Sequence, residues 1–190
     1  YKDVSSGKPV IVVGAGPVGV AVATFIGQRG HRVLLLDRWE GVYPQPRAVH
    51  ADDEVRRIIE LLGVGDEFDA VSRPTLGLRL VDREHRTLAE FERAGVNDHT
   101  GYPRAMLFDQ PVLEKILRAN LPPTVELRGG AEVTSVRQRV GEPVLVDYVE
   151  GGSSITVAAS YVVGADGANS LVRESIGAMM THLGFEQRWL

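Results

Sequence analysis

Three glycines at a fixed spacing follow the apolar segment 10–13, and their positions are suited to binding phosphate. Gly14, Gly16 and Gly19 form a Gly-x-Gly-x-x-Gly pattern that includes Pro17. The first glycine allows a tight turn out of a strand, the second lets the backbone approach phosphates, and the third lets a helix pack close to the sheet. The N-terminus of that helix offers free N–H groups and a partial positive charge. The pattern therefore predicts a site for a dinucleotide pyrophosphate.

A second apolar segment ends in a carboxylate at a distance typical of nucleotide-binding units. Residues 20–30 have the small and apolar composition of a helix packed on a sheet. Residues 31–37 resemble a second buried parallel strand, and its last residue, Asp37, follows Gly19 by 18 positions. An acid roughly 20 residues after the glycines hydrogen-bonds an adenosine ribose, and its charge would repel a 2′-phosphate. We therefore expect FAD or NAD here rather than NADP.

The composition excludes several functional classes. The 190 residues carry a formal net charge of −4 with both signs mixed, which gives no basic face for nucleic acid and no polybasic membrane patch. No apolar segment reaches the roughly 20 residues of a membrane span. Cysteine is absent, which excludes disulfides, thiol nucleophiles and cysteine metal sites. We expect a cytoplasmic protein without a metal site, with one domain or one domain plus pieces of a second.

The segments after the second strand depart from a simple alternation of strand and helix. Residues 39–47 are expected to form a loop, and residues 52–62 have helical spacing. Residues 76–81 and 87–91 alternate like the two strands of a hairpin around a polar turn. We expect this hairpin to belong to a second sheet inserted into the nucleotide domain.

A further helix and a group of short strands follow the hairpin. The helix is expected to begin at Asp109 and to end at residues 120–123. Short strands separated by glycines predict a small antiparallel sheet from segments 125–127, 132–139, 144–149 and 155–157.

A second motif places a carboxylate at the end of another strand. Residues 161–164 are expected to form a strand that leads into Ala165-Asp166-Gly167, and a helix is expected over 170–176. Open α/β sheets bind ligands at the carboxyl ends of their strands, which favours a ligand contact for Asp166. The alternative of similar weight is that Asp166 caps the following helix.

Together these motifs resemble the FAD-dependent aromatic hydroxylases, the single-component flavoprotein monooxygenases that include p-hydroxybenzoate hydroxylase and phenol hydroxylase. The likeness is strongest to the 3-(3-hydroxyphenyl)propionate hydroxylase branch. The segments that carry it, in family order, are 14–19, 37–38, 46–50, 108–114 and 164–173. The resemblance implies an α/β fold: a Rossmann-like FAD-binding domain with a mixed parallel sheet and a small antiparallel sheet, followed by the beginning of an inserted substrate domain.

The resemblance also implies a division of the chain. Residues 9–74 and 106–178 would form the FAD-binding domain, and residues 75–105 would belong to or face the substrate domain. Residues 179–190 would begin the substrate domain. The family's third fingerprint, a Gly-Asp pair leading into a helix, is not found after Arg173. We therefore expect the sequence to be a fragment.

The family's cofactor contacts carry over position by position. The glycine turn would approach the FAD pyrophosphate, and the acid after the second strand would hold the AMP ribose. An arginine offers charge-assisted bonds to phosphate, and a glutamine offers a donor and an acceptor to hydroxyls. The alternatives without a cofactor contact are that Arg47 lies on the surface and that Gln110 only begins a helix. The implied FAD-binding residues are Gly14, Gly16, Pro17, Gly19, Asp37, Arg38, Arg47, Gln110, Asp166 and Gly167.

Asp52 is the strongest candidate for catalysis. Its position resembles that of the active-site acid of phenol hydroxylases, which helps a substrate phenol lose its proton. General-base assistance of this kind accelerates reactions by about 100-fold to 10,000-fold. The alternative is that Asp52 or Asp53 caps the helix that follows. His50 is a second candidate base or substrate contact, although a lone loop histidine is more often solvated.

The resemblance implies a monooxygenase that hydroxylates a phenolic substrate with dioxygen and NADH or NADPH, through a flavin C4a-hydroperoxide. A homodimer is compatible with the family. Two alternatives stay open from the residues: a flavin reductase or dehydrogenase of similar architecture, and a non-catalytic module that binds FAD or NAD.

Overall fold

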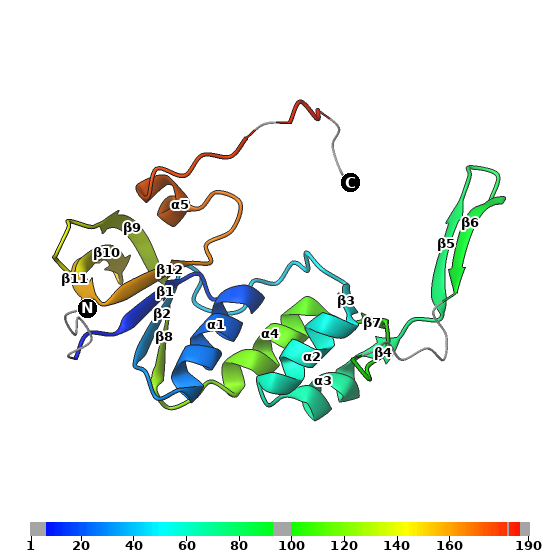
Figure 1. Cartoon of the computed structure of the whole chain (residues 1–190), viewed down its shortest axis with the longest axis horizontal. Helices are drawn as coiled ribbons and strands as arrows, with labels where there is room; N and C mark the ends of the chain where they lie inside the picture. Colours follow the sequence, from blue (N-terminus) through cyan, green and yellow to red (C-terminus); the bar gives the residue numbers. More distant parts are fainter. Residues whose placement is uncertain (1–6, 93–99, 182, 187–190) are drawn as a thin grey trace.

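A four-stranded parallel sheet forms the centre of the molecule (Figure 1). The computed structural model describes residues 7–92, 100–181 and 183–186. The strands, in their order across the sheet, are β12 (Tyr161–Gly164), β1 (Val10–Val13), β2 (Val33–Asp37) and β8 (Val125–Gly129). The predicted strands 10–13 and 31–37 are thereby confirmed, with the second one beginning at Val33.

The two faces of this sheet pack against different layers. Val12 and Leu35 face helices α1 (Pro17–Gln28) and α4 (Gln110–Ala119), whereas Ile11, Val13 and Leu36 face the opposite layer. Successive side chains of a strand point to opposite faces, so a strand covered on both faces is apolar throughout. This is why segments 10–13 and 33–36 are continuous apolar runs.

The opposite layer is an antiparallel sheet. It consists of β9 (Ala131–Arg137), β10 (Val144–Glu150) and β11 (Ser153–Ala159), with helix α5 (Leu171–Ser175) packed beside it. Figure 1 shows this layer and the helices on opposite sides of the central sheet. The predicted antiparallel sheet is confirmed for three of its four segments.

Segment 125–127 was the exception, because the prediction that it joins the antiparallel sheet is wrong. It belongs to β8, which pairs in parallel with β2 from Val33↔Val125 onward. Helix α4 precedes β8, and a helical crossover returns the chain parallel to its earlier strands. Val125 and Leu127 pack against the helical layer.

A second helical region lies beside α4. It contains α2 (Asp53–Leu61), which was predicted, and α3 (Gly65–Val71), which was not. Phe68 of α3 is fully buried in the helical core. Helix α3 has only 7 residues, too few for a clear helical repeat in the sequence.

An arginine joins these two helices. The buried Arg56 of α2 donates from Nε and Nη2 to the two carboxylate oxygens of Asp69 in α3, both at 2.7 Å. Its Nη1 also donates to Glu60, and its guanidinium lies 4.7 Å from the centroid of the Tyr102 ring. The hydrogen bonds to Asp69 raise the pKa of Arg56, so the group stays charged in its buried position.

A small antiparallel sheet borders this region and holds the candidate catalytic segment. Its strands are β3 (His50–Asp52), β7 (Ala105–Leu107) and β4 (Arg73–Pro74), with β7 in the centre. These strands have two or three residues each, and the sequence did not predict them.

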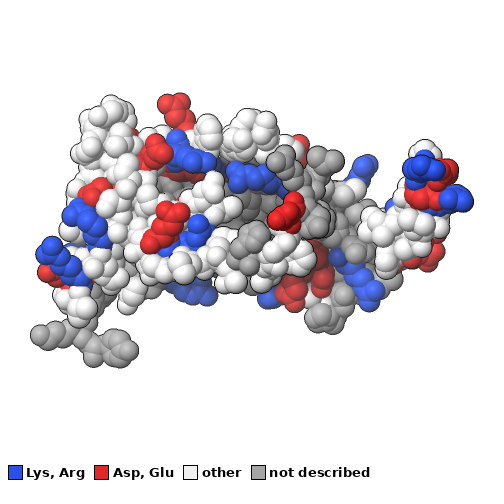
Figure 2. Space-filling model, turned by 90° about the horizontal axis from the view of Figure 1, so that it is seen from above, with Lys and Arg blue, Asp and Glu red and all other residues white. Residues whose placement is uncertain are grey.

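The predicted hairpin is present as β5 (Gly77–Val81) and β6 (Thr87–Glu92), which project from the rest of the molecule (Figure 1). In its turn, Asp82 Oδ1 accepts hydrogen bonds from the amides of Glu84 and Arg86, both at 2.9 Å. Charges of both signs lie at the end of the hairpin and are mixed over the face drawn in Figure 2.

The domain boundaries expected from the resemblance stay predictions. Parts of the expected segments 75–105 and 179–190 lie outside the described residues, namely 93–99, 182 and 187–190. Within the described part of the chain, no helix is long and apolar enough to cross a membrane, and no three side chains are grouped as metal ligands.

Candidate functional site

A cavity of about 300 Å³ opens at the carboxyl ends of the central strands. β1 lies between β2 and β12, so the chain leaves β1 toward one side and returns in β12 on the other. Parallel α/β sheets bind ligands where the strand order reverses in this way. The turn after β1 and the segment after β12 meet here, where the Ala165 amide donates to the Val13 carbonyl at 2.8 Å.

Gly14 and Gly19 shape the turn itself. Gly14 has a φ of +96°, and a Cβ added to it would overlap the Ala165 carbonyl. A Cβ on Gly19 would overlap the carbonyl oxygen of Gly14, because α1 starts directly against the turn. Side chains are therefore excluded at both positions by the protein's own backbone.

Gly16 differs from these two glycines because nothing in the protein requires it. Its φ of −72° suits any residue, and no atom lies within 4 Å of an added Cβ. Gly16 is the N-cap of α1, where no side chain caps the first turn, and Pro17 follows it. The first N–H groups of a helix need acceptors, and a phosphate is a suitable one. The open space and uncapped amides fit a pyrophosphate.

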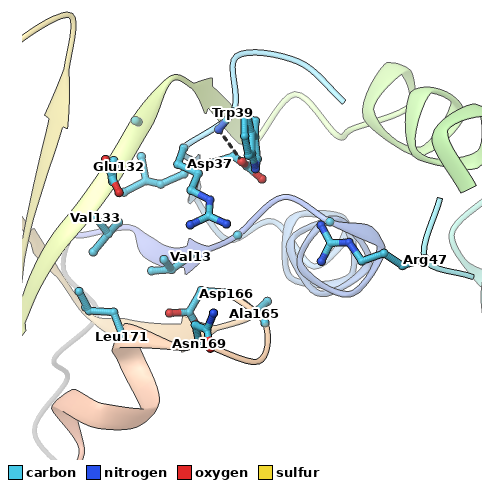
Figure 3. Close-up of a pocket in the computed structure, with 16 residues that line it drawn as sticks. Val13, Asp37, Trp39, Arg47, Glu132, Val133, Ala165, Asp166, Asn169 and Leu171 are labelled. Atoms are coloured by element: carbon cyan, nitrogen blue, oxygen red, sulfur yellow. Dashed lines mark hydrogen bonds between the residues drawn. The ribbon is translucent and has the colours of Figure 1, made fainter. Parts of the chain in front are cut away.

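Asp37 connects the ends of two neighbouring strands. Its Oδ2 accepts a hydrogen bond from the Ala15 amide at 2.6 Å. Its Oδ1 accepts one from the Trp39 amide at 2.8 Å, which is drawn in Figure 3. A carboxylate has about four acceptor positions, so each oxygen keeps capacity for a further donor. Asp37 lines the cavity and can accept from ribose hydroxyls there.

Gln110 holds the loop that carries Arg47. Its Oε1 accepts hydrogen bonds from the amides of Arg47 and Ala48, at 2.9 and 2.8 Å, and its Nε2 donates to Glu114 at 2.8 Å. The oxygen has thus used both lone pairs on the protein. Gln110 is the first residue of α4, and its direct contact with a cofactor stays a prediction.

Arg47 itself lines the cavity. It lies across the cavity from Glu132 and Val133 of β9 (Figure 3), with its guanidinium 5.1 Å from the centroid of the Tyr43 ring. Arg38 also lines the cavity, and its guanidinium is 5.6 Å from the Trp39 ring centroid. Two cationic side chains therefore border a cavity that contains an uncapped helix N-terminus.

Asp166 contacts the helix that follows it, and its contact with a ligand stays a prediction. It lines the cavity, and its carboxylate also accepts hydrogen bonds from the Ser170 hydroxyl and from the Val172 amide, the latter at 3.1 Å. Its helix contacts are therefore present, although Ser170 is the N-cap of α5. Gly167 lines the cavity beside it with a φ of +82°.

Asp52 and His50 lie in β3, and neither is among the residues that line this cavity. Asp52 is the N-cap of α2, with Oδ1 accepting from the Val55 amide at 2.8 Å. The neighbouring Asp53 accepts from the Thr100 hydroxyl at 2.8 Å. The capping interpretation of Asp52 is therefore confirmed, and its catalytic role stays a prediction.

Sequence reasoning missed several residues of the site. Trp39, Glu132 and Val133 line the cavity, and Arg118 of α4 contacts the glycine turn. Trp39 directly follows the quoted motif 37–38 and could have been included with it. Glu132, Val133 and Arg118 come from segments distant in sequence and carry no local signal.

Comparison with known proteins identifies the family. Residues 8–189 match the family described as FAD binding domain, and the chain belongs to it. The chain is 38% identical over 186 residues to a probable NADH-specific resorcinol 4-hydroxylase of Rhodococcus jostii, covering 95% of this chain and 34% of that protein. It is 35% identical over 167 residues to a 3-(3-hydroxy-phenyl)propionate/3-hydroxycinnamic acid hydroxylase of Paraburkholderia xenovorans, covering 86% and 26%.

Solved structures agree with this assignment. The p-nitrophenol 4-monooxygenase PnpA of Pseudomonas putida matches with a TM-score of 0.83 and 28% identity, over 90% of this chain and 43% of that one. The flavin-dependent monooxygenase PieE, in complex with FAD and substrate, matches with a TM-score of 0.79 and 25% identity, over 90% and 32%. The fold and the family predicted from the motifs are confirmed. The chain spans about a third or less of the length of the two hydroxylases above.

The contrast between the glycines predicts opposite effects of substitution. Gly16→Ser should leave the free energy of unfolding unchanged or raise it by a few tenths of a kcal/mol, because serine is a good N-cap. The same serine oxygen would occupy the amides left for phosphate, so FAD affinity should fall at least about tenfold. Urea unfolding and flavin fluorescence titration measure the two quantities.

Gly14→Ala is the matched comparison, because its φ and the overlap with Ala165 make it costly to the fold. We expect it to lower the free energy of unfolding by about 2 kcal/mol. Equal stability losses in the two variants, or wild-type FAD affinity in Gly16→Ser, would contradict the assignment of Gly16 to the ligand.

Proposed function

We propose that this chain forms the FAD site of a monooxygenase that hydroxylates a phenolic substrate. The observation that carries the proposal is the uncapped N-terminus of α1 at a glycine turn, facing a cavity bordered by Asp37 and Arg47. Membership of the FAD-binding family supports the cofactor. The named activities of the relatives, on resorcinol, hydroxyphenylpropionate and p-nitrophenol, support a phenolic substrate.

The described residues have complementary roles toward this cofactor. The amides of the turn at Gly16 would bind the pyrophosphate, and Asp37 would accept from the AMP ribose. Arg38 and Arg47 would offset the phosphate charge, which an arginine does with charge-assisted hydrogen bonds. Asp166 and Gly167 would border the cofactor from the end of β12.

The chemistry of the reaction belongs to the cofactor. When bound, FAD would supply the redox chemistry, with a reduced nicotinamide as the hydride donor and dioxygen as the source of the oxygen atom that enters the ring. The protein's contribution is to hold and orient the reactants and to exclude water. The name of the Rhodococcus relative supports NADH as the donor, with NADPH as the alternative. Dioxygen as co-substrate and a homodimer are further expectations from the family resemblance.

Asp52 is proposed as the group that accepts the phenol proton. Its Oδ1 is used in the cap of α2, and its Oδ2 has no hydrogen bond to another described residue. The side chain is exposed on β3, beside His50, which is the second candidate for contact with the substrate. An ionised phenol is more electron-rich at its ortho and para carbons, which favours electrophilic oxygen transfer.

A hydroxylation assay tests the proposed activity. The purified full-length protein is incubated with FAD, NADH or NADPH, isotope-labelled dioxygen, and resorcinol or 3-(3-hydroxyphenyl)propionate. We expect one phenol to stimulate nicotinamide oxidation and the labelled oxygen to enter the ring.

Two results would overturn this proposal in different ways. Nicotinamide oxidation without label in the product would indicate a flavin reductase or dehydrogenase. Binding of FAD without nicotinamide oxidation with either phenol would indicate a non-catalytic binding module.

Substitution of Asp52 separates its two roles. Asp52→Asn keeps a good N-cap, so the free energy of unfolding should change by less than about 0.5 kcal/mol. Loss of the carboxylate should lower the hydroxylation rate by about 100-fold or more. Asp109→Asn is the control, because Asp109 caps α4 in the same way through the Val112 amide at 3.2 Å. Equal rates in the two variants would exclude Asp52 as the base.

A further inference from the structure

A largely buried arginine of α4 contacts the glycine turn. Arg118 Nη2 donates a hydrogen bond to the Ala15 carbonyl at 2.7 Å, across 103 positions of sequence. The Arg118 side chain is 11% exposed. Neither the glycine pattern nor the motif that begins at Phe108 marks this residue.

The hydrogen bond to the Ala15 carbonyl is shorter than the two distances from the Arg118 guanidinium to carboxylates. Arg118 Nη2 lies 3.7 Å from Asp37 Oδ2 and 4.0 Å from Glu114 Oε2, which are ion-pair distances too long for hydrogen bonds. Its buried Nε has no hydrogen-bond partner among the described residues. The side chain is therefore oriented by the turn's carbonyl and not by a two-pronged pair with a carboxylate.

Holding the Ala15 carbonyl also fixes the amide of Gly16. The peptide unit is planar and trans, so the N–H of Gly16 points opposite to the C=O of Ala15. Asp37 meanwhile accepts the N–H of Ala15 itself. The two peptide units on either side of Ala15 are thus both fixed by charged side chains, and Gly16 lines the cavity.

The charge of Arg118 has a second effect. Asp37 and Glu114 are both buried, with exposures of 9% and 3%, and together with Arg118 they line a small pocket beside Gly16. Without the arginine, two carboxylates would face a site that has to accept a pyrophosphate. A buried charge is screened weakly, so this repulsion would reach the ligand.

We propose that Arg118 is a positioning residue that orients the Gly16 amide toward the pyrophosphate of FAD and offsets the charges of the nearby carboxylates Asp37 and Glu114. The inference rests on the proposed FAD site and adds a residue on α4 to the turn that forms it. Arg118 acts through the backbone of Ala15 and Gly16.

Binding of three probes tests this role. FAD and ADP contain the pyrophosphate, whereas adenosine does not. In Arg118→Met we expect the dissociation constants of FAD and ADP to rise by about 10-fold to 100-fold, the range of one charge-assisted hydrogen bond. Adenosine should bind as to the wild type. Fluorescence and NMR titrations of the purified protein give the three constants.

A second measurement needs no ligand. The amide resonance of Gly16 in the ligand-free protein should shift in Arg118→Met, because the peptide unit loses its fixed orientation. Arg29→Met is the control, since Arg29 also donates to a backbone carbonyl, that of Phe25 at 2.8 Å, but on the exposed end of α1. It should change neither the Gly16 resonance nor the binding of any probe.

Two further variants separate orientation from charge. Arg118→Lys keeps the charge with a shorter reach and should restore FAD affinity in part. Glu114→Gln combined with Arg118→Met removes one of the two repelling carboxylates. Incomplete recovery of FAD affinity in this double variant is expected, because the Ala15 carbonyl still lacks its donor.

The outcomes distinguish this inference from the proposed function. If the wild type binds FAD, and Arg118→Met binds both FAD and ADP with the same dissociation constants as the wild type, Arg118 has no positioning role. An equal loss for adenosine and ADP would also overturn it, since that indicates general damage to the fold. If the wild type binds neither FAD nor ADP, the proposed function fails and the inference fails with it.

Discussion

The hydrogen bond from the Ala15 amide to the Asp37 carboxylate is the interaction on which the rest of the site depends. It joins the turn after β1 to the end of β2. The ends of the two strands and the start of helix α1 are thereby held in fixed positions relative to one another. The other oxygen of Asp37 holds the Trp39 amide and thereby starts the loop that leads to Arg47. A charge-assisted bond to a buried carboxylate is stronger than a neutral one, which suits a contact that sets the position of several groups.

The glycine turn combines requirements of two kinds. Gly14 and Gly19 are required by contacts within the protein, where a side chain would overlap backbone atoms of the turn or of the segment after β12. Gly16 faces open space, and its backbone conformation suits any residue. One short motif therefore holds two glycines that the turn requires and one glycine that faces open space. The same division explains why a glycine pattern alone says less about binding than the environment of each glycine.

The sequence was sufficient where the signal is local. The strand, glycine turn, helix and second strand were predicted because apolar runs, glycine spacing and Asp37 lie within 28 positions, from Val10 to Asp37. The parallel pairing of β8 was not predicted, because a short apolar segment fits either kind of sheet and its partner is distant in the chain. Arg118 and the cavity residues of β9 depend on contacts between distant segments. Gln110 was predicted as a cofactor contact, and its hydrogen bonds to the Arg47 loop could be known only from the fold.

The central claim is that this chain recognises the pyrophosphate-containing half of FAD through the turn at Gly16. Comparison of FAD with FMN tests it most directly, because FMN has the same flavin ring but lacks the AMP half. Equilibrium titration of the purified protein should give a dissociation constant for FMN at least about 100-fold above that for FAD, since the contacts of the turn and of Asp37 are lost. Equal affinity for the two flavins would contradict the claim.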